Sequence, residues 1–413
     1  MADSLTLNGK PLLRFLSFAT GIGMIYSSIL TVEHYFAANF PETIWEGSIC
    51  DINAFFNCDS SAFSMISQVG GVPLGYFGIV VGALVCLGAL FPSIEFERTN
   101  KSIALLNAVG VVALFFFSVL YIGSLCLLCS VYYLFSLVSF GLFWKYGVDS
   151  DAPGLLAKYL RPSVKYVVTF AVITLIGAYG FALYHDARAD AATGGVATRI
   201  VDQYFSLPVV GDPSFISPFW TARATENWED APIRVVDYAD LLCPDCLYLN
   251  EQLERLAEEF DGKINIAFQL FPLEGKCNDV VEKDLHPAAC DVSLMAIHDP
   301  DSFQAIHDEI WANFREAKRE PEWRADLASR YGVKDALEDP ETQALLDRII
   351  QTGKEYERTS DEYEHGIRST PTMIINGRMI IGTLPYDQLR AIFQALVDQA
   401  EGEGGFIESW ERS

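Results

Sequence analysis

Six of the nine cysteines in this 413-residue sequence stand in closely spaced pairs: Cys50 with Cys58, Cys126 with Cys129, and Cys243 with Cys246. A dithiol that is oxidised to a disulfide gives up two electrons and two protons. Thiolate–disulfide exchange passes these on only when sulfur atoms meet directly. Three pairs in one chain therefore predict a relay of electrons from one disulfide to the next.

Zinc binding is the alternative use of clustered cysteines. No histidine accompanies the first four cysteines, and they stand among strongly hydrophobic residues. Four cysteines could in principle bind zinc without a His, but the mixed hydrophobic setting argues for redox use. We therefore favour redox chemistry and expect no metal site.

The two parts of the chain differ sharply in charge. Residues 1–185 carry a net charge of −2 and are apolar, whereas residues 186–413 carry a net charge of −23. Because phosphate binding needs a basic face, this composition argues against a nucleic-acid partner. The acidity of the second part is typical of a solvated surface.

Five apolar stretches in the first part are long enough to cross a bilayer as helices, at about 20 residues each. The first is too long for the apolar core of a signal peptide, so we expect it to be retained. The predicted spans are Pro11–Val32, Val72–Pro92, Ser102–Ile122, Leu125–Trp144 and Tyr166–Tyr184.

Basic residues in the short loops predict the orientation of these spans, because Lys and Arg collect on the cytoplasmic side. They occur only before or at the start of span one, between spans two and three, and between spans four and five: Lys10, Arg14, Arg98, Lys101, Lys145, Lys158, Arg161 and Lys165. We expect a cytoplasmic N-terminus in a bacterial inner or plasma membrane, with the acidic domain outside. All three cysteine pairs then face the compartment where disulfides persist.

The membrane cysteines lie where the predicted elements begin and end. Cys126-Leu-Leu-Cys129 opens the fourth span, where the helix N-terminus lowers a thiol pKa and favours attack. The stretch after Cys58 predicts a short helix on the membrane surface that stops at Gly70-Gly71 before the second span. Cys86 is alone within the second span, and we interpret it as a packing residue.

Residues 11–150 resemble the vitamin K epoxide reductase family, including its bacterial homologues. The resemblance rests on Cys50-Asp51, Cys58, Ser64, the GGVPLGYFG run at residues 70–78, and Cys126-Leu-Leu-Cys129. In that family the pair in the fourth span faces a quinone held among the helices. A loop pair carries electrons to it from a thioredoxin-like partner.

This resemblance implies roles for individual residues. Cys126 and Cys129 would be the active pair, with Cys129 facing the quinone and Cys126 receiving electrons from Cys50. Ser64 would form a hydrogen bond near the quinone, although a lone Ser also commonly caps or back-bonds a helix. Tyr133, one helical turn beyond Cys129, would reach the same pocket.

The identity of the quinone stays open among ubiquinone, menaquinone and phylloquinone types. The vertebrate enzymes of the family carry an Asn near the start of the second span that contacts a quinone carbonyl. This sequence has apolar residues there, such as Leu74.

The acidic part contains a strand, a CxxC motif and a helix in succession. The apolar stretch Ile233–Tyr238 leads into Cys243-Pro-Asp-Cys246, and leucines at helical spacing follow. This order is typical of thioredoxin folds. It predicts an exposed nucleophile at Cys243 and a resolving thiol at Cys246.

The rest of this part resembles the DsbA-like branch of the thioredoxin fold over about residues 230–400. We expect a strand at Ile264–Leu273, helices over Pro287–Lys354, a hairpin turning at Asn376-Gly377 and a final helix at Tyr386–Gln399. The resemblance implies a cis peptide bond at Thr370-Pro371 beside the CxxC pair.

Cys277 and Cys290 remain, thirteen residues apart. In an oxidising compartment we expect them to form a structural disulfide, worth about 3 kcal/mol for a loop of this size. His286 lies nearby in sequence, and we interpret it as an ordinary surface or packing residue.

We therefore predict a transmembrane bundle of four core helices and a fifth linking helix, followed by an α/β thioredoxin-like domain with a helical insertion. The expected domains are 1–150, a fifth helix and linker at 151–200 (the linker, or a helix extension, beginning near residue 185), and 201–413. The predicted function is a membrane thiol oxidase that forms disulfides in exported proteins and passes their electrons to the membrane quinone pool. The alternatives are a tethered thiol reductase or isomerase supplied with electrons in the reverse direction, and a peptide-binding module.

Overall fold

The computed structural model describes residues 7–44, 58–122, 124–281, 284–356 and 366–401. Among these, residues 7–39 and 58–190 form one compact unit, and residues 40–44 and 191–401 form the other. The first is helical and the second is a thioredoxin-like α/β fold with a mixed sheet, so the predicted fold class is confirmed. The domain boundaries at residues 150 and 200 remain predictions.

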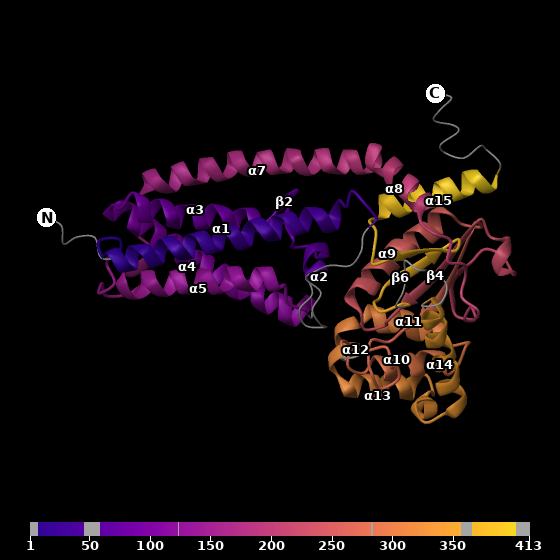
Figure 1. Cartoon of the computed structure of the whole chain (residues 1–413). Coiled ribbons are helices and arrows are strands. Elements are labelled where there is room, and N and C mark those ends of the chain that lie inside the picture. Colours follow the sequence, from indigo (N-terminus) through magenta and orange to yellow (C-terminus); the bar gives the residue numbers. More distant parts are fainter. Residues whose placement is uncertain (1–6, 45–57, 123, 282–283, 357–365, 402–413) are drawn as a thin grey trace. The chain divides into compact units, whose positions relative to one another are not determined.

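The helical unit is built from long helices and two very short strands. Figure 1 shows α1, α3, α4 and α5 running alongside one another. The elements are α1 (Pro11–Asn39), α2 (Asp59–Phe63), β1 (Gln68–Val69), β2 (Val72–Pro73), α3 (Leu74–Leu90), α4 (Ile94–Phe117), a π-helical turn η1 (Ser118–Ile122), α5 (Leu127–Tyr146), α6 (Leu155–Tyr159) and α7 (Val164–Thr193).

Four helices in the described part of the chain are long and apolar enough to cross a membrane. They are α1, the continuous α4–η1 segment, α5 and α7. The remaining predicted span corresponds to α3, which is apolar but has only 17 residues. At 1.5 Å per residue this helix is about 25 Å long, slightly less than the hydrocarbon core of a typical bilayer.

Small residues bring α1 and α3 into close contact. A Cβ atom on Gly82 would lie 2.8 Å from the carbonyl oxygen of Gly21, and one on Gly21 would lie 2.6 Å from Cys86 Sγ. The two helix backbones therefore pack at a distance that excludes side chains at these positions. Cys86 is buried in this contact, as expected for a packing residue.

The helix of the third predicted span starts eight residues earlier than expected. Ser93 caps α4 by accepting a hydrogen bond from the Phe96 N–H, and the charged segment before Ser102 is the first part of the helix. Glu97 in this segment is fully buried and accepts backbone N–H groups of Leu7 and Val148. Apolarity alone missed this start because two of its charges, Glu97 and Lys101, are buried and hydrogen-bonded inside the protein.

Gly70 and Gly71 were expected to end a helix, but they form the turn of a β-hairpin. The short helix predicted after Cys58 is present as α2, but it ends at Phe63. Strands β1 and β2 then pair antiparallel, with both glycines at positive φ between them. Glycine is suited to this backbone conformation because it has no Cβ.

The second unit has a five-stranded sheet in the order β3-β5-β4-β6-β7, in which β4 pairs parallel with β5 and antiparallel with β6. The hairpin between β6 and β7 turns at Asn376-Gly377, both at positive φ. The edge strand β3 was not predicted. The strands are β3 (Trp220–Arg223), β4 (Ile233–Ala239), β5 (Ile264–Leu270), β6 (Thr372–Ile375) and β7 (Arg378–Ile381).

Helices cover both faces of this sheet. One apolar core joins α8, α9 and α15 to the sheet, and the other joins the helical insertion to the opposite face. The helical elements are α8 (Gly195–Ser206), η2 (Trp228–Asp230), α9 (Pro244–Glu259), α10 (Ala289–Ile297), α11 (Phe303–Ala312), α12 (Phe314–Arg319), α13 (Pro321–Arg330), η3 (Lys334–Leu337), α14 (Pro340–Glu355) and α15 (Tyr386–Ala400).

The segment from residue 185 to 199, expected as a linker or a helix extension, is helical. Helix α7 continues to Thr193, and α8 begins at Gly195. Ile200 and Tyr204 of α8 are fully buried, and the Tyr204 hydroxyl donates to the Ile375 carbonyl. The helix extension is therefore the correct alternative, because alanines favour helix and α8 has an apolar face to bury.

Candidate functional site

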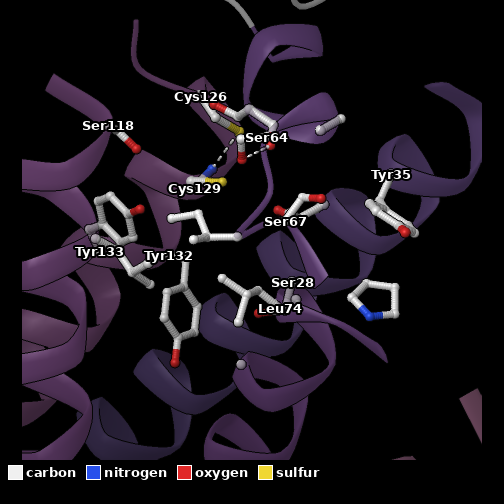
Figure 2. A pocket seen from close by; sticks show the side chains of 18 of the residues that line it. Ser28, Tyr35, Ser64, Ser67, Leu74, Ser118, Cys126, Cys129, Tyr132 and Tyr133 are labelled. Carbon is white, nitrogen blue, oxygen red and sulfur yellow. Dashed lines mark hydrogen bonds between the residues drawn. The ribbon is translucent and has the colours of Figure 1, made fainter. Parts of the chain in front are cut away.

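A cavity of about 220 Å³ lies within the helical unit. Its wall is mainly apolar, with a few polar side chains, as is usual for sites that bind organic ligands. Figure 2 shows how these side chains converge. The lining includes Thr31, His34, Cys58, Ser64, Leu74, Asn107, Ser118, Cys126, Cys129, Tyr132 and Tyr133.

The start of α5 brings Cys126 and Cys129 together at this cavity. Cys126 is the N-cap residue of α5, and its Sγ accepts the backbone N–H of Cys129 at 3.2 Å. An N–H donor at a helix N-terminus stabilises a thiolate. The geometry therefore suits Cys126 to act as a nucleophile or as a leaving group in disulfide exchange.

Cys58 lies in the same place. It packs against Cys126 in one small buried cluster, and it is disulfide-bonded. Cys50 and Asp51 lie outside the described residues, so the predicted transfer between Cys50 and Cys126 remains a prediction.

Ser64 and Tyr133 both line the cavity, as the family resemblance implies. The Ser64 hydroxyl donates a hydrogen bond to the Ser61 carbonyl at 2.8 Å, which is the back-bonding alternative. It can still accept a hydrogen bond, but it must rotate to donate one to a ligand. Tyr133 lies beside Ser118 on the wall close to Cys129 (Figure 2).

Sequence reasoning missed Asn107, a polar residue that α4 contributes to the cavity. Leu74 lines the cavity, and Asn107 of α4 lines it as well. The Tyr132 hydroxyl donates to Asn107 Oδ1 at 2.7 Å, and Asn107 Nδ2 donates to the Ser136 hydroxyl. An amide nitrogen has two hydrogens, so one donor of Asn107 remains for a ligand. No motif identifies Asn107, because only packing of α4 against α5 brings it to the cavity.

His34 was also missed. This residue of α1 lines the cavity, and its Nε2 lies 2.9 Å from Asp59 Oδ1, next in sequence to Cys58. The pair therefore places an acid–base group beside the sulfurs of Cys58 and Cys126. A His followed by an aromatic residue in an apolar helix carries no sequence signal for this role.

The second cysteine centre lies at the start of α9. Cys243 is the N-cap residue, Pro244 is the first helical residue and Cys246 lies in the first turn. Cys243 Sγ lies 3.6 Å from the Thr370 carbonyl oxygen, and the Thr370–Pro371 bond is cis. Cys243 was expected to be exposed. It is only 3% exposed, because the chain at Thr370 covers its sulfur.

Cys246 is fully buried beside charged groups. Burial raises the pKa of the Cys246 thiol well above its ordinary value, and Cys243 and Asp237 act in the same direction. Burial likewise raises the pKa of Asp237 to about 7. An unpaired carboxyl at this depth favours its protonated form. Asp237 can therefore hold a proton next to the resolving thiol near neutral pH.

Lys318 of α12 is a further charged group near this centre. Burial lowers the pKa of its ammonium, while Cys243, Asp240 and Asp245 favour the charged form. The ammonium of Lys318 therefore interacts electrostatically with the CxxC segment. Cations near a cysteine stabilise its thiolate.

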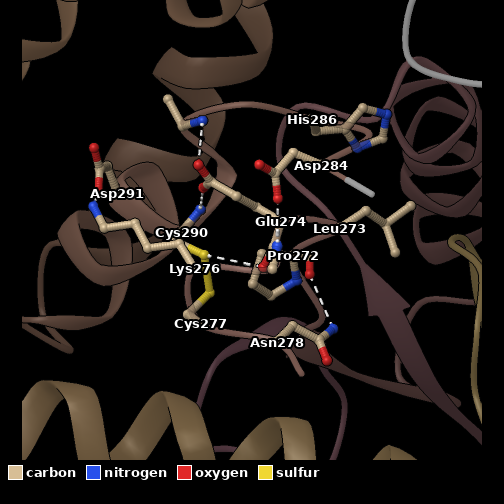
Figure 3. Close-up of a disulfide and its surroundings, with 12 residues drawn as sticks. Pro272, Leu273, Glu274, Lys276, Cys277, Asn278, Asp284, His286, Cys290 and Asp291 are labelled. Carbon is tan, nitrogen blue, oxygen red and sulfur yellow. Dashed lines mark hydrogen bonds and ion pairs between the residues drawn. A yellow bond between two sulfur atoms is a disulfide. The ribbon is translucent and has the colours of Figure 1, made fainter. Parts of the chain in front are cut away.

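Cys277 and Cys290 are joined by a disulfide (Figure 3). His286 was interpreted as an ordinary surface or packing residue, and the structure excludes a surface position. Its side chain is nearly buried, and its Nδ1 lies 2.8 Å from Asp240 Oδ2. The two residues are 46 positions apart in sequence, so their pairing depends on the tertiary fold.

The family models match both parts of this architecture. Residues 14–144 match the vitamin K epoxide reductase family, and residues 228–395 match a thioredoxin family. The chain carries a vitamin K epoxide reductase domain followed by a thioredoxin-like domain. The predicted recognition is thereby confirmed, and the matches together with the cysteine geometry support a thiol–disulfide oxidoreductase.

Curated relatives point to the same chemistry. The chain is 28% identical over 158 residues to a probable disulfide bond formation protein D of Bacillus cereus. The aligned region covers 37% of this chain and 68% of that protein. It is 27% identical over 171 residues to disulfide bond formation protein D of Bacillus subtilis, covering 39% and 71% respectively.

Solved structures match as well, at low identity. Oxidised BdbD from Bacillus subtilis is 19% identical, with a TM-score of 0.35, and covers 46% of this chain and 97% of that one. The protein α-DsbA2 from Wolbachia pipientis is 18% identical, with a TM-score of 0.32, covering 50% and 97% respectively.

Proposed function

We propose that the protein is a membrane thiol oxidase that forms disulfides in exported proteins and delivers their electrons to a quinone. The observation that carries the proposal is the cavity that Cys58, Cys126 and Cys129 line together with apolar and polar side chains. A thiol–disulfide centre and a ligand site that share one wall can exchange electrons directly.

The proposed relay begins at the thioredoxin-like domain. A substrate thiolate attacks the Cys243–Cys246 disulfide, and resolution leaves the substrate oxidised and this pair as a dithiol. Cys243 then attacks the disulfide of Cys58, and the loop thiols in turn reduce the Cys126–Cys129 disulfide. Each step exchanges one disulfide for another through a mixed disulfide, so two electrons and two protons move at every stage.

The cavity residues fit a quinone head group. Tyr133 lies on the wall near Cys129, and the free N–H of Asn107 supplies a hydrogen-bond donor on another wall. Leu74 and other apolar side chains would pack against the ring. A bound quinone would accept the two electrons and two protons of the Cys126–Cys129 dithiol. Ubiquinone, menaquinone and phylloquinone types fit this chemistry equally.

We also propose five membrane spans, with α3 as the short one. The basic residues in the loops favour a cytoplasmic N-terminus and a thioredoxin-like domain on the extracytoplasmic side. Exported proteins with free thiols are the proposed partners of that domain.

Thiol trapping in membranes tests the relay. The variant Cys129→Ser should leave the Cys243–Cys246 pair reduced in cells, because the last thiol pair that reaches the quinone is broken. Acid quenching followed by alkylation with a mass tag reports the redox state of the pair. The matched control is Cys86→Ser, which alters a packing cysteine of the same unit and should leave the pair oxidised.

A Cys243–Cys246 pair that stays oxidised in the Cys129→Ser variant contradicts the relay. A pair that is reduced even in the wild-type chain would instead favour a reductase or isomerase supplied with electrons in the reverse direction.

A further inference from the structure

The carboxylate of Asp240 joins three segments of the thioredoxin-like unit. Its Oδ1 accepts the N–H of Leu242 at 2.7 Å, and its Oδ2 accepts the N–H of Leu273 at 2.7 Å. Oδ2 also lies 2.8 Å from His286 Nδ1. Asp240 is fully buried. A buried carboxylate persists only when donors such as these satisfy it.

The backbone of Asp240 contacts both cysteines of the CxxC motif. Its N–H points at Cys246 Sγ at 3.5 Å, and its carbonyl accepts the N–H of Cys243 at 3.0 Å. Asp240 therefore fixes the short segment between β4 and α9 that carries the redox pair. Its N–H is also a donor that lowers the pKa of the Cys246 thiol, against the effect of burial.

His286 reaches Asp240 from the segment closed by the second disulfide. Hydrogen bonds hold the C-terminal part of this segment: the Glu274 carboxylate accepts the N–H groups of Ala288 and Cys290 (Figure 3), and the Leu273 carbonyl accepts that of His286. His286 lies between Cys277 and Cys290 in the chain. The bridge therefore limits the freedom of the residue that pairs with Asp240.

We propose that Asp240 and His286 are positioning residues for Cys246, and that the Cys277–Cys290 bridge holds this pair in place. The proposal rests on the proposed use of Cys243 and Cys246 as a redox centre. Without the His286 donor, the buried carboxylate of Asp240 would be less compensated near Cys246. The uncompensated negative charge would raise the free energy of the reduced Cys243–Cys246 pair relative to its disulfide.

The test is the reduction potential of the Cys243–Cys246 pair in the full-length protein in detergent. In glutathione buffers, two glutathione thiols give two electrons and two protons to the disulfide and become oxidised glutathione. After acid quenching and alkylation, mass spectrometry of the peptide that contains both cysteines gives the reduced fraction. His286→Leu should shift the exchange constant about tenfold toward the disulfide, or about 30 mV.

Two further variants separate positioning from general damage. His286→Asn keeps an N–H donor where His286 has Nδ1, and it should restore the exchange constant to within threefold of wild type. His298→Leu is the matched control, because His298 also pairs with side chains of the insertion, Thr342 and Asp339, but does not contact the CxxC segment. It should leave the exchange constant unchanged.

The bridge is tested by replacing Cys277 and Cys290 together with Ser. A shift in the same direction as that of His286→Leu supports the link between the two disulfides. An unchanged exchange constant overturns that part of the proposal. An unchanged exchange constant in His286→Leu, or an equal shift in His298→Leu, overturns the positioning role itself.

This measurement is independent of the membrane relay. The exchange constant of the pair is defined whether or not electrons continue to Cys126 and Cys129. If the relay proposal fails while His286→Leu still shifts the constant, the positioning role stands for a redox pair with another electron partner.

Discussion

At the scale of single residues, the sites depend on buried polar groups beside sulfur. His34 pairs with Asp59 near Cys126, and Asp237 lies near Cys246, where burial alone accounts for its raised pKa. Exchange between thiols and disulfides releases and takes up protons, so groups that hold a proton near neutral pH belong at such sites. Asp237 offers the clearest measurable consequence.

Asp237 should make the stability of the thioredoxin-like unit depend on pH. Burial raises its pKa to about 7, whereas an unfolded chain has a carboxyl pKa near 3.8. The folded state thus binds the extra proton between these values, and this contribution to stability falls as pH rises from about 4 to about 7. At about 1.4 kcal/mol per pKa unit, the total is about 4 kcal/mol. Asp237→Asn should remove most of this decline.

The measurement is the free energy of unfolding of the oxidised protein against pH, followed by tryptophan fluorescence in denaturant. Asp261→Asn removes an exposed carboxylate of the same unit and serves as the control. Parallel pH curves for wild type and Asp237→Asn would show that the carboxyl does not carry the dependence.

At the scale of elements, the cavity exists because helices meet at defined distances. Close packing of α1 on α3 needs glycine where the backbones approach, and α7 contacts the bundle through aromatic and hydroxyl groups. For example, the Tyr76 hydroxyl donates to the Thr174 carbonyl, and Phe36 packs on Tyr184. This packing sets where Leu74 lies relative to the start of α5, on the wall of the cavity.

Replacing a contact glycine should therefore destabilise the helical unit. The new Cβ in Gly82→Ala would meet the Gly21 backbone at 2.8 Å, and overpacking of this kind costs about 1–3 kcal/mol. Gly141→Ala is the matched control, because nothing lies within 4 Å of its Cβ position and Ala favours helix. The melting temperature in detergent should fall for Gly82→Ala and should not fall for Gly141→Ala. Equal melting temperatures would contradict the close contact.

At the scale of the whole molecule, the two proposed redox centres, Cys126–Cys129 and Cys243–Cys246, are carried on one chain. A short tether raises the effective concentration of one partner at the other into the mM range. Such a gain appears only if the proposed transfer runs between the thioredoxin-like domain and the membrane domain of the same chain.

Mixing two complementary variants tests this advantage. One chain lacks the soluble pair, as Cys243→Ser with Cys246→Ser, and the other lacks the membrane pair, as Cys126→Ser with Cys129→Ser. At about 10 µM of each, quinone-dependent oxidation of a dithiol peptide should be about a hundredfold slower than for the intact chain. A rate equal to that of the intact chain would show that the transfer gains nothing from the fusion.

The sequence by itself determined the two-part architecture, the cysteine pairs and most of the regular elements. Periodic apolarity, the CxxC spacing and the Asn376-Gly377 turn are local signals, because each depends only on residues close together in the sequence. The helix start at Ile94 and strand β3 were missed, and the sequence left the α8 segment open between a linker and a helix, because the burial of these elements depends on distant partners.

Only the tertiary structure decided what surrounds the sulfurs. It buries Cys243 under Thr370, pairs His286 with Asp240, and brings Asn107 and Tyr132 to the cavity. These partners come from separate elements, and a side chain's polarity is matched only where packing brings a complementary group within hydrogen-bond distance. The distances between such partners cannot be predicted from sequence spacing, because they depend on how helices and strands pack.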